Sequence, residues 1–217
     1  MNVIAFVTQK GGTGKSSLAV SLAVADEERG LKTSIIDLDP QGTAKNWYER
    51  REGTGGPEVN AIQAGQLDAA IGILKKQGVQ LVIIDTPGVD TPAATAAIQV
   101  ANLCLIPARP SIADIEAAAP TVRSITRLGK PFSYVLNQCP PGRSIRTSDA
   151  FRVLQLSGAV ASTPLAMRAD HMDALATGQG VTERDTTSKA ATEVRELLQW
   201  ALNRMEGKQH GQEARVA

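Results

Sequence analysis

The chain has 217 residues, which is enough for one well-buried α/β domain and too few for two of ordinary size. Apolar residues make up 42% of the chain and charged residues 21%, both ordinary for a soluble globular protein. The formal net charge is +1, which excludes an overall electrostatic field that favours a polyanion, so contact with nucleic acid requires a local basic patch.

Short apolar runs alternate with helical patterns along the chain. The predicted strands are Val3–Val7, Thr33–Ile36, an edge strand near Val59–Gln63, Leu81–Ile84, Leu103–Ile106, Phe132–Leu136 and a weaker Ala159–Ala161. The predicted helices are Ser16–Arg29, Gly42–Arg51, Gln66–Gln77, Pro92–Ala101, Ile112–Leu128, Thr147–Leu156, Met167–Ala176 and Lys189–Met205. This alternation predicts a single-domain, doubly wound α/β fold: a mostly parallel sheet with helices on both faces, joined by right-handed crossovers.

The domain is predicted over residues 1–206, followed by a polar tail over 207–217. No basic segment precedes the apolar residues 2–8, so we expect a first strand there and no signal peptide. Cys104 and Cys139 fit neither a disulfide framework nor a zinc site and are interpreted as free thiols in a reducing cytosol. His171 and His210 lack partners at metal-binding spacing and are interpreted as surface histidines.

The most informative segment lies between the first predicted strand and the first predicted helix. Such a glycine loop offers backbone N–H groups and a helix N-terminus to phosphates. Lys15 is predicted to reach the β- and γ-phosphates, and the Ser16 hydroxyl to bind Mg²⁺. A chance glycine-rich loop is the alternative, and the flanking patterns argue against it. The predicted cofactor-binding residues of the loop are Gly11, Gly12, Thr13, Gly14, Lys15, Ser16 and Ser17.

Polar or Pro/Gly-containing segments follow the other main strands. Ligands of doubly wound sheets bind beyond the carboxyl ends of the strands, so we expect these segments to converge on one edge. They are Asp37–Gln41, Asp85–Gly88, Pro107–Pro110 and Asn137–Gln138.

Asp85 ends an apolar run, where a carboxylate is placed to hold Mg²⁺; a turn-forming Asp is the alternative. Asp37 and Asp39 follow the second strand, and a carboxylate in such a loop can orient an attacking water. One solvated and one turn-capping Asp is the alternative for this pair.

The strict phosphate-loop pattern requires Gly at position 9, where this chain has Gln9, and the loop instead reads K-G-G-T-G-K-S with a second lysine, Lys10. This motif resembles the deviant Walker A motif of the ParA/MinD ATPase family. Asp37–Gln41 (D-L-D-P-Q) resembles the family's switch I, and Asp85–Gly88 its switch II. The resemblance covers the chain from Met1 to about Met205 and is nearest to the small ParA-type partition ATPases.

The resemblance implies ATP and Mg²⁺ as cofactors and ATP hydrolysis to ADP and phosphate. It implies that Lys10 reaches the partner's phosphates in an ATP-sandwich homodimer, as an arginine finger does. It also implies that Asp39 positions the water and that Asp37 supports Lys15 or the metal shell.

The resemblance further implies that Asn137 reads adenine, and Pro107, which opens the neighbouring loop, is predicted as a second cofactor contact. An Asn at a strand end is also a common turn former. Arg109 and Asp114 flank that loop and fit either a dimer interface or a base pocket.

Non-specific DNA is an expected partner, because family members bind it as dimers and release it when a ParB-like or cargo-adaptor protein stimulates hydrolysis. The candidate contacts are Arg143, Arg146 and Arg168; scattered arginines are also common on solvated faces. This implies a cytoplasmic, nucleoid-associated protein without the operator binding of longer relatives.

Two other functions stay open. One is a membrane-associated positioning ATPase of MinD type, although residues 207–217 carry little apolar bulk, so we expect no membrane contact. The other is a metabolic ATP-dependent enzyme, whose turnover would depend on an added small molecule.

Overall fold

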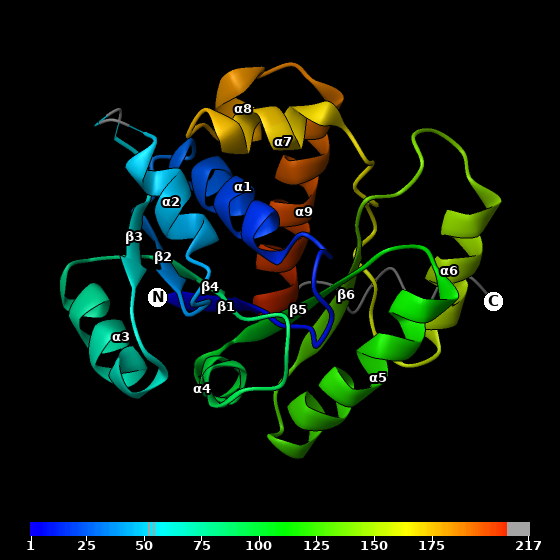
Figure 1. Cartoon of the computed structure of the whole chain (residues 1–217), viewed down its shortest axis with the longest axis horizontal. Coiled ribbons are helices and arrows are strands. Elements are labelled where there is room, and N and C mark those ends of the chain that lie inside the picture. Colours follow the sequence, from blue (N-terminus) through cyan, green and yellow to red (C-terminus); the bar gives the residue numbers. More distant parts are fainter. Residues whose placement is uncertain (52, 54, 208–217) are drawn as a thin grey trace.

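The structure, a computed structural model, describes residues 1–51, 53 and 55–207. Apart from Gly207, the predicted tail therefore lies outside the described residues, as does His210. Six strands form one sheet in the order β3-β2-β4-β1-β5-β6 (Figure 1). Each neighbouring pair is parallel, so the carboxyl ends of all six strands lie at the same edge. The strands are β1 (Asn2–Phe6), β2 (Thr33–Asp37), β3 (Glu58–Ala61), β4 (Leu81–Asp85), β5 (Leu103–Ala108) and β6 (Phe132–Leu136).

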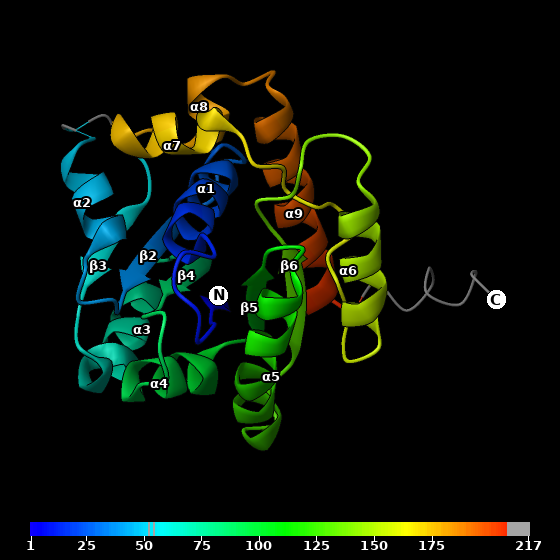
Figure 2. The same ribbon diagram turned by 45° about the vertical axis from the view of Figure 1, so that its right-hand side comes forward.

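Helices cover both faces of this sheet (Figures 1 and 2). In both views, α1, α2 and α9 lie on one side with α7 and α8 beyond them, and α3, α4 and α5 lie on the other. The predicted doubly wound α/β fold is thus confirmed. The helices are α1 (Lys15–Glu27), α2 (Thr43–Glu49), the 3₁₀ turn η1 (Ala64–Gln66), α3 (Leu67–Lys76), α4 (Pro92–Val100), α5 (Ile112–Arg127), α6 (Ile145–Gln155), α7 (Ala169–Ala176), α8 (Val181–Arg184) and α9 (Lys189–Met205).

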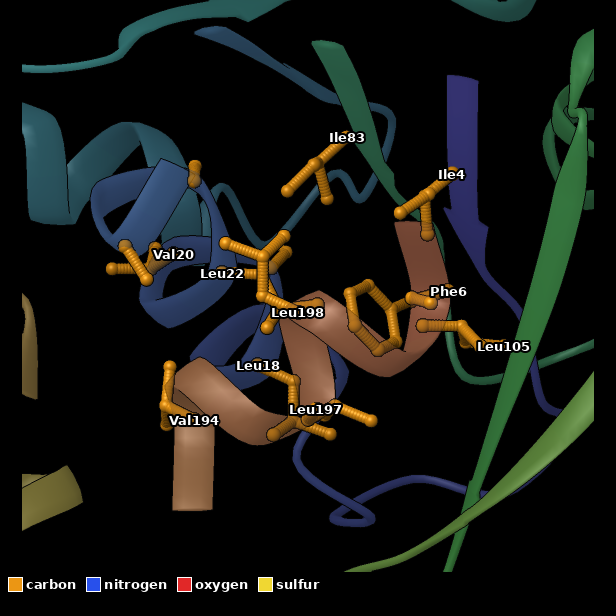
Figure 3. Packing of buried hydrophobic residues seen from close by; sticks show 14 of the residues in the cluster. Ile4, Phe6, Leu18, Val20, Leu22, Ile83, Leu105, Val194, Leu197 and Leu198 are labelled. Carbon is orange, nitrogen blue, oxygen red and sulfur yellow. The ribbon is translucent and has the colours of Figure 1, made fainter. Parts of the chain in front are cut away.

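Two apolar layers hold these elements together, because successive strand residues point to opposite faces. Ile4 and Phe6 of β1 pack against α1 and α9, where Leu18 and Leu197 meet them (Figure 3). Val3 and the other strand residues that point to the opposite face pack there against the side chains of α3 to α6. Burial of each such aliphatic side chain stabilises the folded chain by about 1.5–3 kcal/mol. Both layers therefore fix the strand ends that carry the site.

Three expectations about the elements need correction. The weak strand Ala159–Ala161 is reduced to a single bridge between Tyr134 and Val160, because its two backbone hydrogen bonds to β6 both involve Tyr134 and the chain next bonds to β6 only at Leu165. The strand β5 continues to Ala108, so Pro107 is buried within the sheet and does not open a loop. The short helix α8 was not predicted, because four residues are too few to show a periodic pattern.

Candidate nucleotide-binding site

A cavity of about 760 Å³ lies at the carboxyl edge of the sheet. The glycine loop, the switch I segment and the switch II segment meet around it, as predicted for segments that follow the carboxyl ends of parallel strands. The lining residues are Gly11, Gly12, Gly14, Lys15, Ser16, Ser17, Asp39, Pro40, Gln41, Thr43, Pro87, Gly88, Val89, Thr91, Gln138 and Leu175.

The glycine loop leads directly into α1 and presents the helix N-terminus to this cavity. Gly14 has a φ of 91°, a left-handed conformation that side chains rarely adopt, and it precedes the first helical residue. Among the described residues, no side chain caps α1, and its first turn carries no acidic residue. The backbone N–H groups and the positive end of the helix dipole therefore suit an anion such as a phosphate.

Lys15 supplies the positive charge of this anion site. Its side chain is buried, and the burial lowers the pKa of its ammonium group against the raising effect of Asp85 and Asp39. A desolvated ammonium interacts more strongly with a phosphate than a solvated one does.

Asp85 has the properties of a magnesium ligand. It is fully buried at the end of β4, and neither carboxylate oxygen has a hydrogen-bond partner of standard geometry among the described residues. Burial raises the pKa of Asp85 to about 7, although the nearby Ser16 hydroxyl lowers it. A carboxylate and a hydroxyl are oxygen ligands that Mg²⁺ prefers, so Asp85 and Ser16 fit the predicted metal.

Asp37 and Asp39 have different surroundings. The Asp37 carboxylate accepts hydrogen bonds from the N–H groups of Asp39 and Lys45, both at 3.0 Å. It therefore caps α2 and anchors the switch I segment. Each of its oxygens accepts one backbone hydrogen bond, and its role in the metal shell stays a prediction. Asp39 is only half-buried and lines the cavity, where its carboxylate can face a bound phosphate.

Three side chains that follow β5 and β6 support the glycine loop from behind. Asn137 donates to the Thr13 carbonyl at 2.8 Å, and both Arg109 and Gln138 donate to the Gly12 carbonyl, at 2.9 and 3.0 Å. These bonds occupy the carbonyls of Gly12 and Thr13 and fix the conformation of the loop. The sequence indicated Asn137 as a base contact and Arg109 as a residue of a dimer interface or a base pocket; the loop-supporting role of Gln138 left no signal in the residue pattern.

Lys10 is turned toward α5 within its own chain. Its ammonium nitrogen lies 2.8 Å from a carboxylate oxygen of Asp114, which also accepts the hydroxyl hydrogen bond of Ser111. Burial raises the pKa of Asp114, but the hydrogen bonds from Lys10 and Ser111 outweigh this effect and leave it below its usual value. Lys10 is not among the residues that line the cavity. The lysine therefore contacts α5 rather than the phosphate region of its own chain.

A second cavity, of about 220 Å³, adjoins the glycine loop. Most of its lining surface is apolar, and polar groups such as those of Asn137 and Arg168 add to it, a combination that suits a flat aromatic base. His171 lines this cavity and is half-buried, so it is not the exposed surface histidine that was predicted. Pro107, which was predicted as a cofactor contact, lines neither cavity. The lining residues are Gly14, Ser17, Leu18, Asn137, Gln138, Ala166, Met167, Arg168, His171, Met172 and Leu175.

The predicted DNA-contacting arginines fall into two groups. Arg143 and Arg146 are exposed at the start of α6, where they are available to a polyanion. Arg168 is bound to Glu193 at 2.6 Å, with only 20% of its side chain exposed, and it lines the smaller cavity. A contact between Arg168 and DNA requires this ion pair to break, and it stays a prediction. Across the described part of the chain, no helix is both long and apolar enough to cross a bilayer.

A phosphate-binding loop between β1 and α1, with a buried carboxylate at the end of β4, defines a nucleotide-binding protein of the P-loop class. Residues 4–216 match the family described as "CobQ/CobB/MinD/ParA nucleotide binding domain". The chain belongs to this family, and the resemblance to ParA and MinD proteins is confirmed.

Known relatives and structures agree with this assignment. The chain is 32% identical over 160 residues, 72% of each protein, to "Maintenance of carboxysome distribution protein A" of Gloeobacter kilaueensis. The structure of apo McdA from Cyanothece superposes with a TM-score of 0.77 at 16% identity, covering 93% of this chain and 99% of that one. MinD of Pyrococcus horikoshii, solved with Mg-ADP, superposes with a TM-score of 0.75 at 18% identity, covering 95% and 97%.

Proposed function

We propose that the chain is an ATP-dependent positioning ATPase whose ATP-bound form is a sandwich dimer. ATP binds with its phosphates on the glycine loop and its base in the smaller cavity, where the Asn137 amide can pair with adenine. Mg²⁺ binds between Ser16 and Asp85. Asp39 positions the attacking water, and Lys10 reaches the partner's phosphates, a contribution worth roughly 10³–10⁵ in rate when a cation is supplied in this way.

The observation that carries this proposal is the buried Asp85 carboxylate beside Lys15 and Ser16, which has no hydrogen-bond partner of standard geometry in the part of the chain that the structure describes. A buried carboxylate without partners is costly unless a cation binds it. A magnesium–triphosphate complex brings the cation to Asp85 and the anion to Lys15, so it satisfies both groups at once.

The proposed dimer binds DNA without sequence specificity, through exposed arginines such as Arg143 and Arg146. A ParB-like or cargo-adaptor partner stimulates hydrolysis and so releases the dimer from DNA. Relatives named for carboxysome distribution support a role in positioning a cargo, which includes a plasmid, a chromosome or a protein assembly. The protein then acts in the cytoplasm, on the nucleoid.

The test measures retention of the protein on non-specific DNA with ATP, with ADP and without nucleotide. We expect ATP-dependent retention of the wild type, loss of retention for Lys10→Ala, and persistent retention for Asp39→Ala, which binds ATP but does not hydrolyse it. Lys32→Ala is the matched control, because Lys32 is exposed and precedes β2 at the opposite edge of the sheet.

Equal retention of the wild type on DNA with ATP, with ADP and without nucleotide would refute the proposed switch. A Lys10→Ala protein that still forms a DNA-bound dimer with full partner-stimulated turnover would refute the trans role of Lys10. Nucleotide-dependent binding to anionic lipid vesicles instead of DNA would favour a MinD-type function, and turnover that requires a small-molecule substrate would favour a metabolic enzyme.

A further inference from the structure

The end of α2 is tied to the segment that follows α7, over more than 120 residues of sequence. Four side chains make this connection: Trp47, Arg50, Arg51 and Glu183. We call this set the clasp. None of them belongs to the glycine loop or to the metal site.

Three backbone carbonyls, one in the last turn of α7 and two in the segment after it, accept hydrogen bonds from the clasp. The Arg50 guanidinium donates to the Leu175 carbonyl at 3.2 Å, and Arg51 donates to the Gly178 carbonyl at 2.9 Å. The indole N–H of Trp47 donates to the Gln179 carbonyl at 3.0 Å. The Leu175 carbonyl lies in the last turn of α7, and the other two carbonyls lie in the segment that follows it, so the end of α2 holds both the helix end and this segment.

A charged pair closes the clasp. The two terminal nitrogens of Arg51 donate to the two carboxylate oxygens of Glu183, at 2.8 and 2.9 Å. The Arg51 guanidinium also lies 4.8 Å from the centre of the fully buried Trp47 ring. Only 4% of the Arg51 side chain is exposed, and a buried charge of this kind holds its geometry because losing its partner is costly.

Gly178 shows how closely the two segments approach. It has a φ of 68°, and a Cβ atom at this position would lie 2.6–2.7 Å from backbone atoms of Arg50 and Arg51. Backbone atoms cannot yield as a flexible side chain can, so only glycine allows this contact. The end of α7 cannot move relative to α2 without breaking the clasp.

The two helices that the clasp joins carry the two recognition regions of the site. The helix α2 begins directly after the switch I segment, and Asp37 fixes its first turn. The helix α7 contributes His171, Met172 and Leu175 to the smaller cavity, and Leu175 lines both cavities. One rigid connection therefore runs from the base region to the switch I segment.

We infer that the clasp makes recognition of the γ-phosphate by the switch I segment depend on occupation of the smaller cavity by the base. A base that packs against α7 fixes the position of this helix, the clasp passes this constraint to α2, and Asp39 is then held where it can meet the γ-phosphate. Two sites that bias one shared element are thermodynamically coupled. The clasp residues are positioning residues, and the inference rests on the proposed function.

A cycle of four ligands measures this coupling. Dissociation constants are determined by calorimetry, in the presence of Mg²⁺, for a non-hydrolysable ATP analogue, ADP, tripolyphosphate and pyrophosphate. The preference for the ATP analogue is the dissociation constant of ADP divided by that of the analogue, and the preference for tripolyphosphate is the dissociation constant of pyrophosphate divided by that of tripolyphosphate. The coupling factor is the first preference divided by the second. For the wild type we expect a factor of at least about five, the lower end of typical allosteric coupling.

Two variants test the clasp, and a third serves as the control. Trp47→Phe removes the indole donor and keeps the ion pair intact, and Glu183→Gln removes the charge that pairs with Arg51. The control, Glu28→Gln, breaks the Arg195–Glu28 pair between α9 and the end of α1; its carboxylate side chain is 30% exposed, against 31% for Glu183. Thermal unfolding establishes that each variant is folded. If Glu183→Gln does not fold, Trp47→Phe alone tests the clasp.

We expect the coupling factor to fall to within about twofold of one in the clasp variants and to stay at the wild-type value in Glu28→Gln. A merely structural role would weaken all four ligands together and leave the factor unchanged, which would overturn the inference. A wild-type factor near one would overturn it too, while leaving the proposed function intact. Failure of the wild type to bind the ATP analogue would overturn both.

Discussion

At the scale of single residues, Asp85 combines a cost in stability with a proposed function in binding Mg²⁺. Its pKa is raised to about 7 by burial, so the folded protein holds this proton more tightly than the unfolded chain does. The free energy of unfolding without ligand therefore falls as pH rises from the ordinary pKa of 3.8 to about 7, and this contribution is constant at higher pH.

We predict that Asp85→Asn stabilises the ligand-free protein at pH 8 by a few kcal/mol, because the variant no longer buries an ionised group. The same variant is expected to lose Mg²⁺-dependent ATP binding. Thermal unfolding between pH 5 and 8, followed by calorimetry with ATP and with or without EDTA, measures both effects. Asp68→Asn, in an exposed position of α3, is the control. An unchanged stability at pH 8 would show that the Asp85 charge is compensated in the wild type.

At the scale of secondary-structure elements, Asp37 links the end of β2 to the start of α2. Its two carboxylate oxygens accept backbone N–H groups of the switch I segment and of α2, in a region where no other side chain caps this helix. The capping of α2 and the placement of Asp39 therefore depend on the same carboxylate.

We predict that Asp37→Ala lowers the free energy of unfolding by about 1 kcal/mol, as the loss of a helix cap does, and also slows ATP hydrolysis. Ser144→Ala removes a comparable cap, since the Ser144 hydroxyl accepts the N–H of Thr147 at the start of α6. It should cost a similar amount of stability without affecting hydrolysis. Urea denaturation and a phosphate-release assay distinguish the two. Equal hydrolysis rates in both variants would contradict a specific role of Asp37.

The elements were predicted from sequence where local rules suffice. The spacing of glycines and lysines between Lys10 and Ser17 defines a phosphate loop, and apolar runs that end in polar residues define buried parallel strands. The pairing of Arg51 with Glu183 was not predictable, because the partners are 132 residues apart and neither position belongs to a motif. Likewise, nothing in the sequence showed that Glu193 pairs with Arg168, or that Asp37 accepts backbone N–H groups of the switch I segment and of α2.

At the scale of the whole molecule, the distribution of unpaired positive charge decides which surface suits the proposed binding of DNA. Arg143 and Arg146 are exposed near the start of α6, whereas Arg168 is held by Glu193 beside the smaller cavity. The first two arginines can replace counterions on a phosphate backbone, and Arg168 cannot do so without breaking its ion pair.

We predict that the double variant Arg143→Ala/Arg146→Ala weakens DNA binding and reduces the slope of log K against log salt by up to about 2, because each phosphate contact contributes about 0.9. Arg168→Ala should weaken nucleotide binding and leave the salt slope unchanged when the protein is saturated with ATP. Fluorescence anisotropy at several salt concentrations measures the slopes. A reduced slope for Arg168→Ala alone would place this residue on the DNA after all.

The chain contains two tryptophans, Trp47 at the junction of α2 with the end of α7 and Trp200 in the core beside α1. An indole that is hydrogen-bonded and lies beneath a guanidinium emits light whose colour and intensity depend on both neighbours. With Trp200 replaced by Phe, the remaining emission reports on this junction alone. The protein therefore contains a built-in optical probe, which lets movements of the switch region be followed in real time without an attached dye.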